Sequence, residues 1–237
     1  MSKGSDVVML DTLYALVTPW AKASKTEIKK NRALGFLANI VYPLYCRIKR
    51  IPNCSVKTGH DEKVIVSLTS YPARIDKVHL CVQSLLRQTY KADKTILWLS
   101  REQFPRELDD IPLELRQLTK YGLTICFVNG DYRSYKKFIY AAQEYSDSII
   151  VTTDDDTLYP KNWLEKLILT HKKYPDCVAC YRAHYMTLDN GRARKYHEWL
   201  GLSPDMKGPD MKLVPIGVGG GCCTPRDFLQ RIPTMLI

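Results

Sequence analysis

From Lys63 onward, short runs of apolar and β-branched residues alternate with longer segments whose apolar positions recur at helical spacing. Strands are predicted at 63–72, 94–100, 123–130 and 148–153, and helices at 74–89, 132–146 and 160–175. The strands are apolar almost throughout, which is typical of strands buried on both faces. The order predicts an α/β fold, with a mostly parallel, Rossmann-like sheet and helices on both faces.

The charge of the chain is concentrated before this α/β region. Residues 1–57 hold ten Lys and Arg against three acids, whereas the whole chain has a net charge of +10. Two parts are therefore expected: a basic, helical N-terminal segment at 1–60, and one domain at 61–237. The chain carries no nucleic-acid motif, so no nucleic-acid partner is expected.

The N-terminal segment contains an apolar stretch, LGFLANIVYPLYC at 34–46, between two basic flanks. A membrane span needs about 20 apolar residues, so this stretch is too short to cross a bilayer. A helix lying on an anionic membrane surface is one interpretation. The other is an amphipathic helix that packs on the domain or on a partner, and both stay open.

The eight cysteines, with no signal peptide before them, indicate reduced thiols and a cytoplasmic protein, on the inner face of the plasma membrane if the segment binds there. Cys177 and Cys180 form a CxxC within a strand-like run. Because no second CxxC follows, they are interpreted as small buried side chains rather than zinc ligands.

Polar clusters follow three of the predicted strands: TSYPAR, NGDYRSYKK and TTDDDT. Ligands of parallel α/β sheets bind beyond the carboxyl ends of the strands, so these clusters predict one site. In an extended chain Asp154 and Asp156 would face one pocket while Asp155 turns aside. Two carboxylates are suitable ligands for Mg²⁺ or Mn²⁺, and the cation would also relieve the repulsion between them. Alternatively, the aspartates form a solvated acidic loop or the start of a helix.

The order of these motifs resembles a known family. A strand with TDDDTLYP, preceded by SLTSYPARI and CVQSLLRQT and followed by IGVGGG, is similar to bacterial family-2-like glycosyltransferases of the GT-A fold, over residues 63–229. Those enzymes build cell-surface polysaccharides. The resemblance implies metal-dependent transfer of a sugar from a nucleotide-sugar donor, UDP-linked, to a hydroxyl of a glycan or lipid-linked acceptor.

The resemblance also implies roles for individual residues. Donor-nucleotide binding falls on Thr69, Ser70, Tyr71, Arg74, Asp131, Arg133, Lys137, Asp154 and Asp155, with Asp154 and Asp156 as the metal-binding pair. For Ser70 and Tyr71 a plain turn is the alternative. Lys136 is expected on a solvated helix face.

The acceptor side is predicted from two further stretches. In RARKYHEWLG, Trp199 beside His197 would stack on a sugar and Glu198 would take the acceptor's proton as catalytic base; alternatively Trp199 is core and Glu198 is surface. In VPIGVGGGCC, Gly219 and Gly220 would let the backbone approach the acceptor, or form a flexible turn.

One expected feature is missing from the sequence. The family usually carries an acidic segment after the glycine-rich strand, and the surroundings of Asp227 do not match it. The domain is therefore expected to be truncated at its acceptor side, completed by another chain, or equipped with an unusual base. A catalytically inactive nucleotide-sugar-binding or membrane-associated scaffold, and a nucleotidyltransferase, remain as alternatives.

Overall fold

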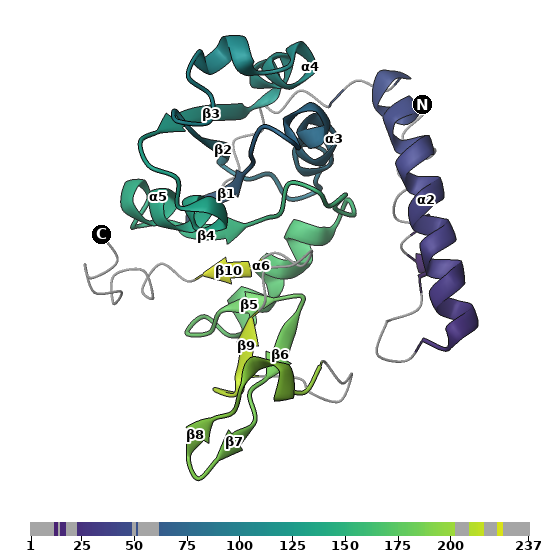
Figure 1. Ribbon diagram of the computed structural model, residues 1–237, viewed down its shortest axis with the longest axis vertical. Coiled ribbons are helices and arrows are strands. Elements are labelled where there is room, and N and C mark those ends of the chain that lie inside the picture. The colour runs from purple at the N-terminus through teal and green to yellow at the C-terminus, as the bar shows by residue number, and fades with distance from the viewer. Residues whose placement is uncertain are drawn as a thin grey trace.

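The computed structural model describes residues 12–13, 15–17, 23–48, 51, 62–201, 209–215 and 222–224. Within them the main sheet has the strand order β3-β2-β1-β4-β10-β5 (Figure 1). Its strands are β1 (Val64–Thr69), β2 (Lys94–Ser100), β3 (Leu123–Val128), β4 (Ile149–Thr152), β5 (Ala179–Cys180) and β10 (Cys222–Thr224). Strands β3, β2, β1 and β4 are parallel, and β10 runs antiparallel between β4 and β5.

The two faces of the sheet build separate cores. Alternate residues of a strand point to opposite faces, so Val66 and Leu68 pack on one side of β1 and Ile65 on the other. Helices α3 (Ile75–Leu86) and α6 (Trp163–Lys173) cover the first face, and α5 (Lys136–Glu144) covers the second. The predicted α/β fold, with helices on both faces, is confirmed.

The remaining elements lie around this sheet. They are α2 (Lys25–Ile48), η2 (Glu107–Asp110), α4 (Leu113–Arg116), η3 (Gln117–Tyr121), η4 (Arg133–Tyr135), β6 (Ala183–Tyr185), β7 (Leu188–Asp189), β8 (Arg192–Ala193), η5 (Tyr196–Glu198) and β9 (Leu213–Pro215). The β7–β8 hairpin extends away from the main sheet (Figure 1). The division of the chain at residue 60 stays a prediction.

Helix α2 lies at the side of the domain and packs there through one face only (Figure 1). Tyr42 is fully buried on that face, and the guanidinium of Arg87 stacks 5.1 Å from the ring centre of Tyr45. In the described part of the chain, no helix is both long and apolar enough to cross a membrane.

An ion pair between the buried Lys136 and the partly exposed Asp131 fixes the connection between β3 and α5. After Gly130, which turns the chain at a φ of 82°, the carboxylate of Asp131 accepts hydrogen bonds from Lys136 Nζ, from Gln103 Nε2 at 2.8 Å and from the Arg133 backbone N–H at 3.0 Å. Lys136 is only 1% exposed, so its predicted position on a solvated helix face is wrong. It begins α5 after the turn η4, and side chains at a helix start point back toward the preceding loop.

This pair predicts the outcome of Asp131→Asn. The variant keeps the shape of the side chain but leaves the buried ammonium of Lys136 without its counter-charge, which costs about 3 kcal/mol of unfolding free energy. Urea unfolding measures the change, and Lys136→Met in the same chain should recover most of it. Glu107→Gln is the matched control: it breaks the exposed pair with Arg101 and should cost less than about 1 kcal/mol. Equal losses for Asp131→Asn and Glu107→Gln would contradict the prediction.

Candidate donor-binding pocket

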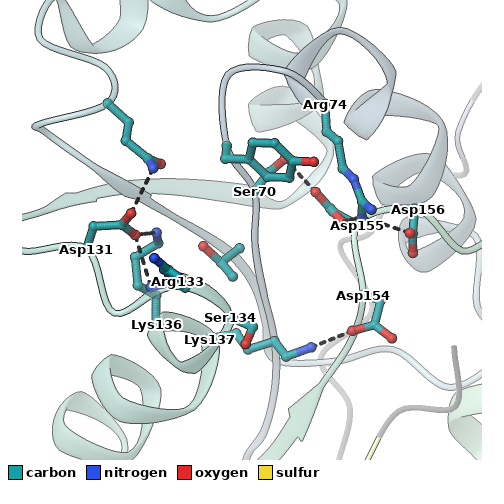
Figure 2. Close-up of a pocket in the computed structure, with 13 residues that line it drawn as sticks. Ser70, Arg74, Asp131, Arg133, Ser134, Lys136, Lys137, Asp154, Asp155 and Asp156 are labelled. Atoms are coloured by element: carbon teal, nitrogen blue, oxygen red, sulfur yellow. Dashed lines mark hydrogen bonds and ion pairs between the residues drawn. The ribbon is translucent and has the colours of Figure 1, made fainter. Parts of the chain in front are cut away.

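A pocket of about 660 Å³ opens at the carboxyl ends of β1, β3 and β4 (Figure 2). Its volume lies within the usual range for small-molecule sites. It is lined by Thr69, Ser70, Tyr71, Arg74, Gln103, Asp131, Arg133, Ser134, Lys136, Lys137, Asp154, Asp155 and Asp156. The structure thus brings together every residue predicted to bind the donor or the metal.

One wall of the pocket is formed by the loop after β1 and the aspartates after β4. Ser70 donates a 2.6 Å hydrogen bond to Asp155 Oδ2, and Arg74 Nη1 lies 2.9 Å from Asp155 Oδ1 and 2.7 Å from Asp156 Oδ2 (Figure 2). The bond to Asp155 raises the pKa of Arg74 above its ordinary value, so the guanidinium stays charged. Two neighbouring carboxylates therefore share one cation.

The floor of the pocket is held by α5 and α3. Lys137 Nζ lies 2.6 Å from Asp154 Oδ1 and donates to the Thr153 carbonyl at 3.0 Å. Beneath this loop the Asp154 N–H donates to the buried Tyr159 hydroxyl at 2.8 Å, and the Cys81 thiol lies 3.1 Å from the Asp154 carbonyl. Burial raises the pKa of Cys81, and the three carboxylates add to the rise, so the thiol keeps its proton and can donate it.

The opposite wall carries Asp131 and Arg133 (Figure 2). The hydrogen bond from Lys136 holds the pKa of Asp131 below its usual value, and the Arg133 N–H acts in the same direction. Asp131 is therefore a carboxylate at neutral pH. Arg133 has a φ of 51°, and its guanidinium makes no ion pair or side-chain hydrogen bond with any residue that the structure describes. Its positive charge also helps to lower the pKa of Asp131, but without an ion pair the guanidinium can still bind a ligand.

These contacts change the expected arrangement of the aspartates. Asp155 was expected to turn aside, but it lines the pocket with its neighbours because the chain turns after Thr153 instead of remaining extended. Its side chain is only 8% exposed, compared with 53% for Asp156. The ion pairs with Arg74 and Lys137 relieve part of the repulsion between the three acids.

The residues predicted for the acceptor side do not line this pocket. His197 and Glu198 lie exposed in η5, with 3.8 Å between His197 Nε2 and Glu198 Oε1. Trp199 donates its indole N–H to the Arg194 carbonyl at 2.9 Å and packs edge-on against Tyr196. Gly219 and Gly220 lie outside the described residues. The roles proposed for all of them stay predictions.

Three residues of the pocket were missed by the sequence interpretation: Gln103, Ser134 and Lys136. Ser134 and Lys136 stand in the polar cluster after β3, and their proximity to Arg133 and Lys137 was the available signal. Gln103 stands in the polar run SREQ at the end of β2, which the sequence interpretation did not count among the clusters. Only the hydrogen bond to Asp131 identifies it.

The aspartates fit a divalent cation in donor type but not as a complete ligand set. Arg74 uses one carboxylate oxygen of Asp156, and the other forms no hydrogen bond or ion pair with a described residue; the side chain is 53% exposed. Across the described ranges, no three His, Cys, Asp or Glu side chains are grouped closely enough to hold a metal. A cation here would take its other ligands from phosphate oxygens and water, as Mg²⁺ and Mn²⁺ often do.

Comparison with known proteins identifies the family. No curated protein matches the sequence. Among solved structures, the chain is similar to the mannosyltransferase PcManGT from Pyrobaculum calidifontis, in complex with GDP-Man and Mn²⁺, with 16% identity and a TM-score of 0.32. The match covers 54% of this chain and only 38% of that one, which is too little to establish an activity.

The sequence itself gives the stronger match. The family described as Glycosyl transferase family 2 matches residues 68–232, which is more than two thirds of the 237 residues. This range includes the loop after β1, the loop after β3 and the three aspartates, and thus every residue that lines the pocket. With its parallel α/β sheet of the GT-A type and this match over most of its length, the chain belongs to glycosyl transferase family 2.

Proposed function

We propose that the chain is a metal-dependent glycosyltransferase that moves a sugar from a UDP-linked donor to a hydroxyl group. The acceptor is a glycan or a lipid-linked glycan in surface polysaccharide assembly. The observation that carries the proposal is the pocket, where loops from β1, β3 and β4 gather four basic and four acidic side chains. Family membership supports sugar transfer, and the pocket supports a phosphate-bearing donor.

The charge pattern of the pocket suits a nucleoside diphosphate. Arg74, Lys136 and Lys137 each form an ion pair with a carboxylate, whereas the guanidinium of Arg133 forms none with a described residue. Arg133 can therefore bind a phosphate oxygen in a charge-assisted hydrogen bond. Asp131, held as a carboxylate, can accept an N–H of the base, and Tyr71 offers a partly exposed ring for stacking.

Asp156, with Asp154 behind it, would hold the divalent cation. When bound, Mn²⁺ or Mg²⁺ supplies positive charge for the diphosphate that leaves. Asp156 contributes a half-exposed carboxylate for this purpose, while Lys137 keeps Asp154 oriented at 2.6 Å. The chain's own residues fix the position of the donor, and this positioning lowers the barrier to transfer.

Titration of UDP into the protein, with and without Mn²⁺, tests the donor site. We expect binding that needs the metal, because the cation offsets the negative charge that the diphosphate brings beside three carboxylates. Asp156→Ala should weaken the metal-dependent binding at least about tenfold. Asp109→Ala, which removes an exposed acid outside the pocket, is the matched control and should bind like the wild type. If UDP does not bind, or binds equally well with and without Mn²⁺, this donor site is excluded.

Turnover separates an enzyme from a binding scaffold. An enzyme of this kind should release UDP from UDP-sugars in the presence of Mn²⁺, by transfer or by slow hydrolysis, and Asp156→Ala should abolish the release. A coupled assay for free UDP measures it. A protein that binds UDP with Mn²⁺ but releases none from any UDP-sugar would instead be a nucleotide-sugar-binding scaffold.

We also propose that α2 attaches the enzyme to an anionic membrane, where a lipid-linked acceptor would lie. Opposite its buried face, α2 exposes Phe36, Leu37, Ile40 and Leu44, whose side chains are between 46% and 70% accessible. Lys29 and Lys30 are exposed on the same face, one to two turns earlier. An apolar stripe next to lysines suits the interface of an anionic bilayer.

Vesicle sedimentation tests this attachment. The protein should sediment with vesicles that contain about 30% phosphatidylserine and less with neutral vesicles, since each lysine near the surface adds about 1 kcal/mol. Phe36→Glu with Ile40→Glu should reduce binding to the anionic vesicles at least about tenfold. The control, Leu169→Glu with Leu200→Glu, changes two similarly exposed apolar residues outside α2 and should bind normally. If the wild type sediments with neither kind of vesicle, the membrane attachment is refuted, and the apolar face of α2 would instead contact a protein.

A further inference from the structure

The most unusual contact of the pocket is that of Arg74 with two consecutive carboxylates. A single guanidinium nitrogen, Nη1, lies 2.9 Å from Asp155 and 2.7 Å from Asp156. Arg74 immediately precedes α3, and its guanidinium carbon lies 5.5 Å from the ring centre of Tyr71. The arginine thus holds the carboxylate oxygens that attract a cation to this wall.

The two contacts of Arg74 differ in strength. Asp155 is 8% exposed and has a second partner in the Ser70 hydroxyl at 2.6 Å. Asp156 is 53% exposed, and Arg74 is its one partner in the described part of the chain. An ion pair open to water is weak and readily exchanged, whereas a shielded one that is also hydrogen-bonded is not. The contact with Asp156 is therefore the one that can be given up.

We propose that Arg74 is a built-in cation that occupies Asp156 while the pocket lacks its donor, and that it competes with the divalent ion for this carboxylate. The inference rests on the proposed function, because it assumes the diphosphate and the metal described above. When a diphosphate enters, its oxygens offer the guanidinium a stronger partner. Arg74 then turns from Asp156 to the phosphate while Asp155 retains it, and Asp156 becomes free for the metal.

This exchange couples the two ligands. Without a nucleotide, a metal ion at Asp156 must either share the carboxylate with Arg74 or displace it, and in both cases it lies close to the positive charge of Arg74, so binding is weak. With a nucleotide, the competition and the repulsion are both reduced because the guanidinium has moved to the phosphate. Linkage requires the effect to be mutual, so the metal strengthens nucleotide binding by the same factor. Arg74 is thus a positioning residue that makes the empty pocket a poor metal site.

Direct measurement of Mn²⁺ binding tests the proposal. Electron paramagnetic resonance of free Mn²⁺ gives its affinity for the wild type and for Arg74→Gln, with and without UDP. Without UDP, Arg74→Gln should bind Mn²⁺ about tenfold more tightly, since the competing charge is gone. The factor by which UDP strengthens Mn²⁺ binding should shrink accordingly. Adding Asp156→Asn to Arg74→Gln should remove the gain, which locates the ion at Asp156.

The control is Arg101→Gln. Arg101 is as exposed as Arg74 and also pairs with a carboxylate, Glu107 at 2.8 Å, but it does not line the pocket. Its loss should leave the Mn²⁺ affinity within about twofold of the wild type, because water and salt screen a distant surface charge. An equal gain in Mn²⁺ affinity for both variants would mean that the net charge of the protein alone determines Mn²⁺ binding. This result would overturn the proposed role of Arg74.

The outcomes separate this inference from the proposed function. If the wild type binds UDP with Mn²⁺ but Arg74→Gln leaves the UDP-free Mn²⁺ affinity unchanged, the competition is refuted and the donor site stands. If the wild type binds neither ligand, both proposals fall. Should Arg74→Gln not fold, Arg74→Lys serves instead: a lysine lacks the planar fork of arginine and should raise Mn²⁺ affinity in the same direction by a smaller factor.

Discussion

Val66 on β1 lies opposite Val151 on β4. Because the two strands are parallel and in this register, both end at the same edge of the sheet. The loop that holds Ser70 and Arg74 therefore meets the aspartates that follow β4, although more than 80 residues separate them in the sequence. The backbone N–H of Thr153 extends the pairing by donating to the Ser67 carbonyl at 2.9 Å. A shift of register here would separate the carboxylates from their cations, and the rest of the site depends on it.

The same meeting of loops explains how the pocket tolerates so many charges. Each acidic side chain of the lining contacts a basic one, and each of these pairs joins two different segments of chain or two turns of the same loop. The pairs therefore act as cross-links as well as neutralising contacts. Among them, only the pair of Arg74 with Asp156 has both side chains about half exposed, and such a weak pair suits a site where a charge must change partners when a ligand enters.

Much of the fold and of the pocket could be predicted from the sequence, because both depend on local patterns. Runs of apolar residues predicted the strands of the sheet, and the polar clusters at the strand ends predicted most of the residues that line the pocket. The partner of each charge could not be predicted in this way. The short turn η4 precedes α5, so the helix begins at Lys136 and not at residue 132 as predicted. The side chain of Lys136 is therefore directed toward Asp131 and is buried. Gln103 stands in the polar run SREQ after β2, but nothing in that run identifies Asp131 as its partner. Asp155 faces the pocket because the chain turns there, whereas an extended chain would have pointed its side chain to the other side.

Strand β10 has a consequence for the order in which the domain assembles. It lies between β4 and β5, and β5 has no other neighbour in the described sheet (Figure 1). Residues 179–180 can therefore join the sheet only together with residues 222–224 or after them. Contacts that close long loops form late in folding, whereas the β1–β4 layer can form from sequential strand–helix units. During synthesis, the strands and loops that build the pocket can be in place before the far edge of the sheet is complete.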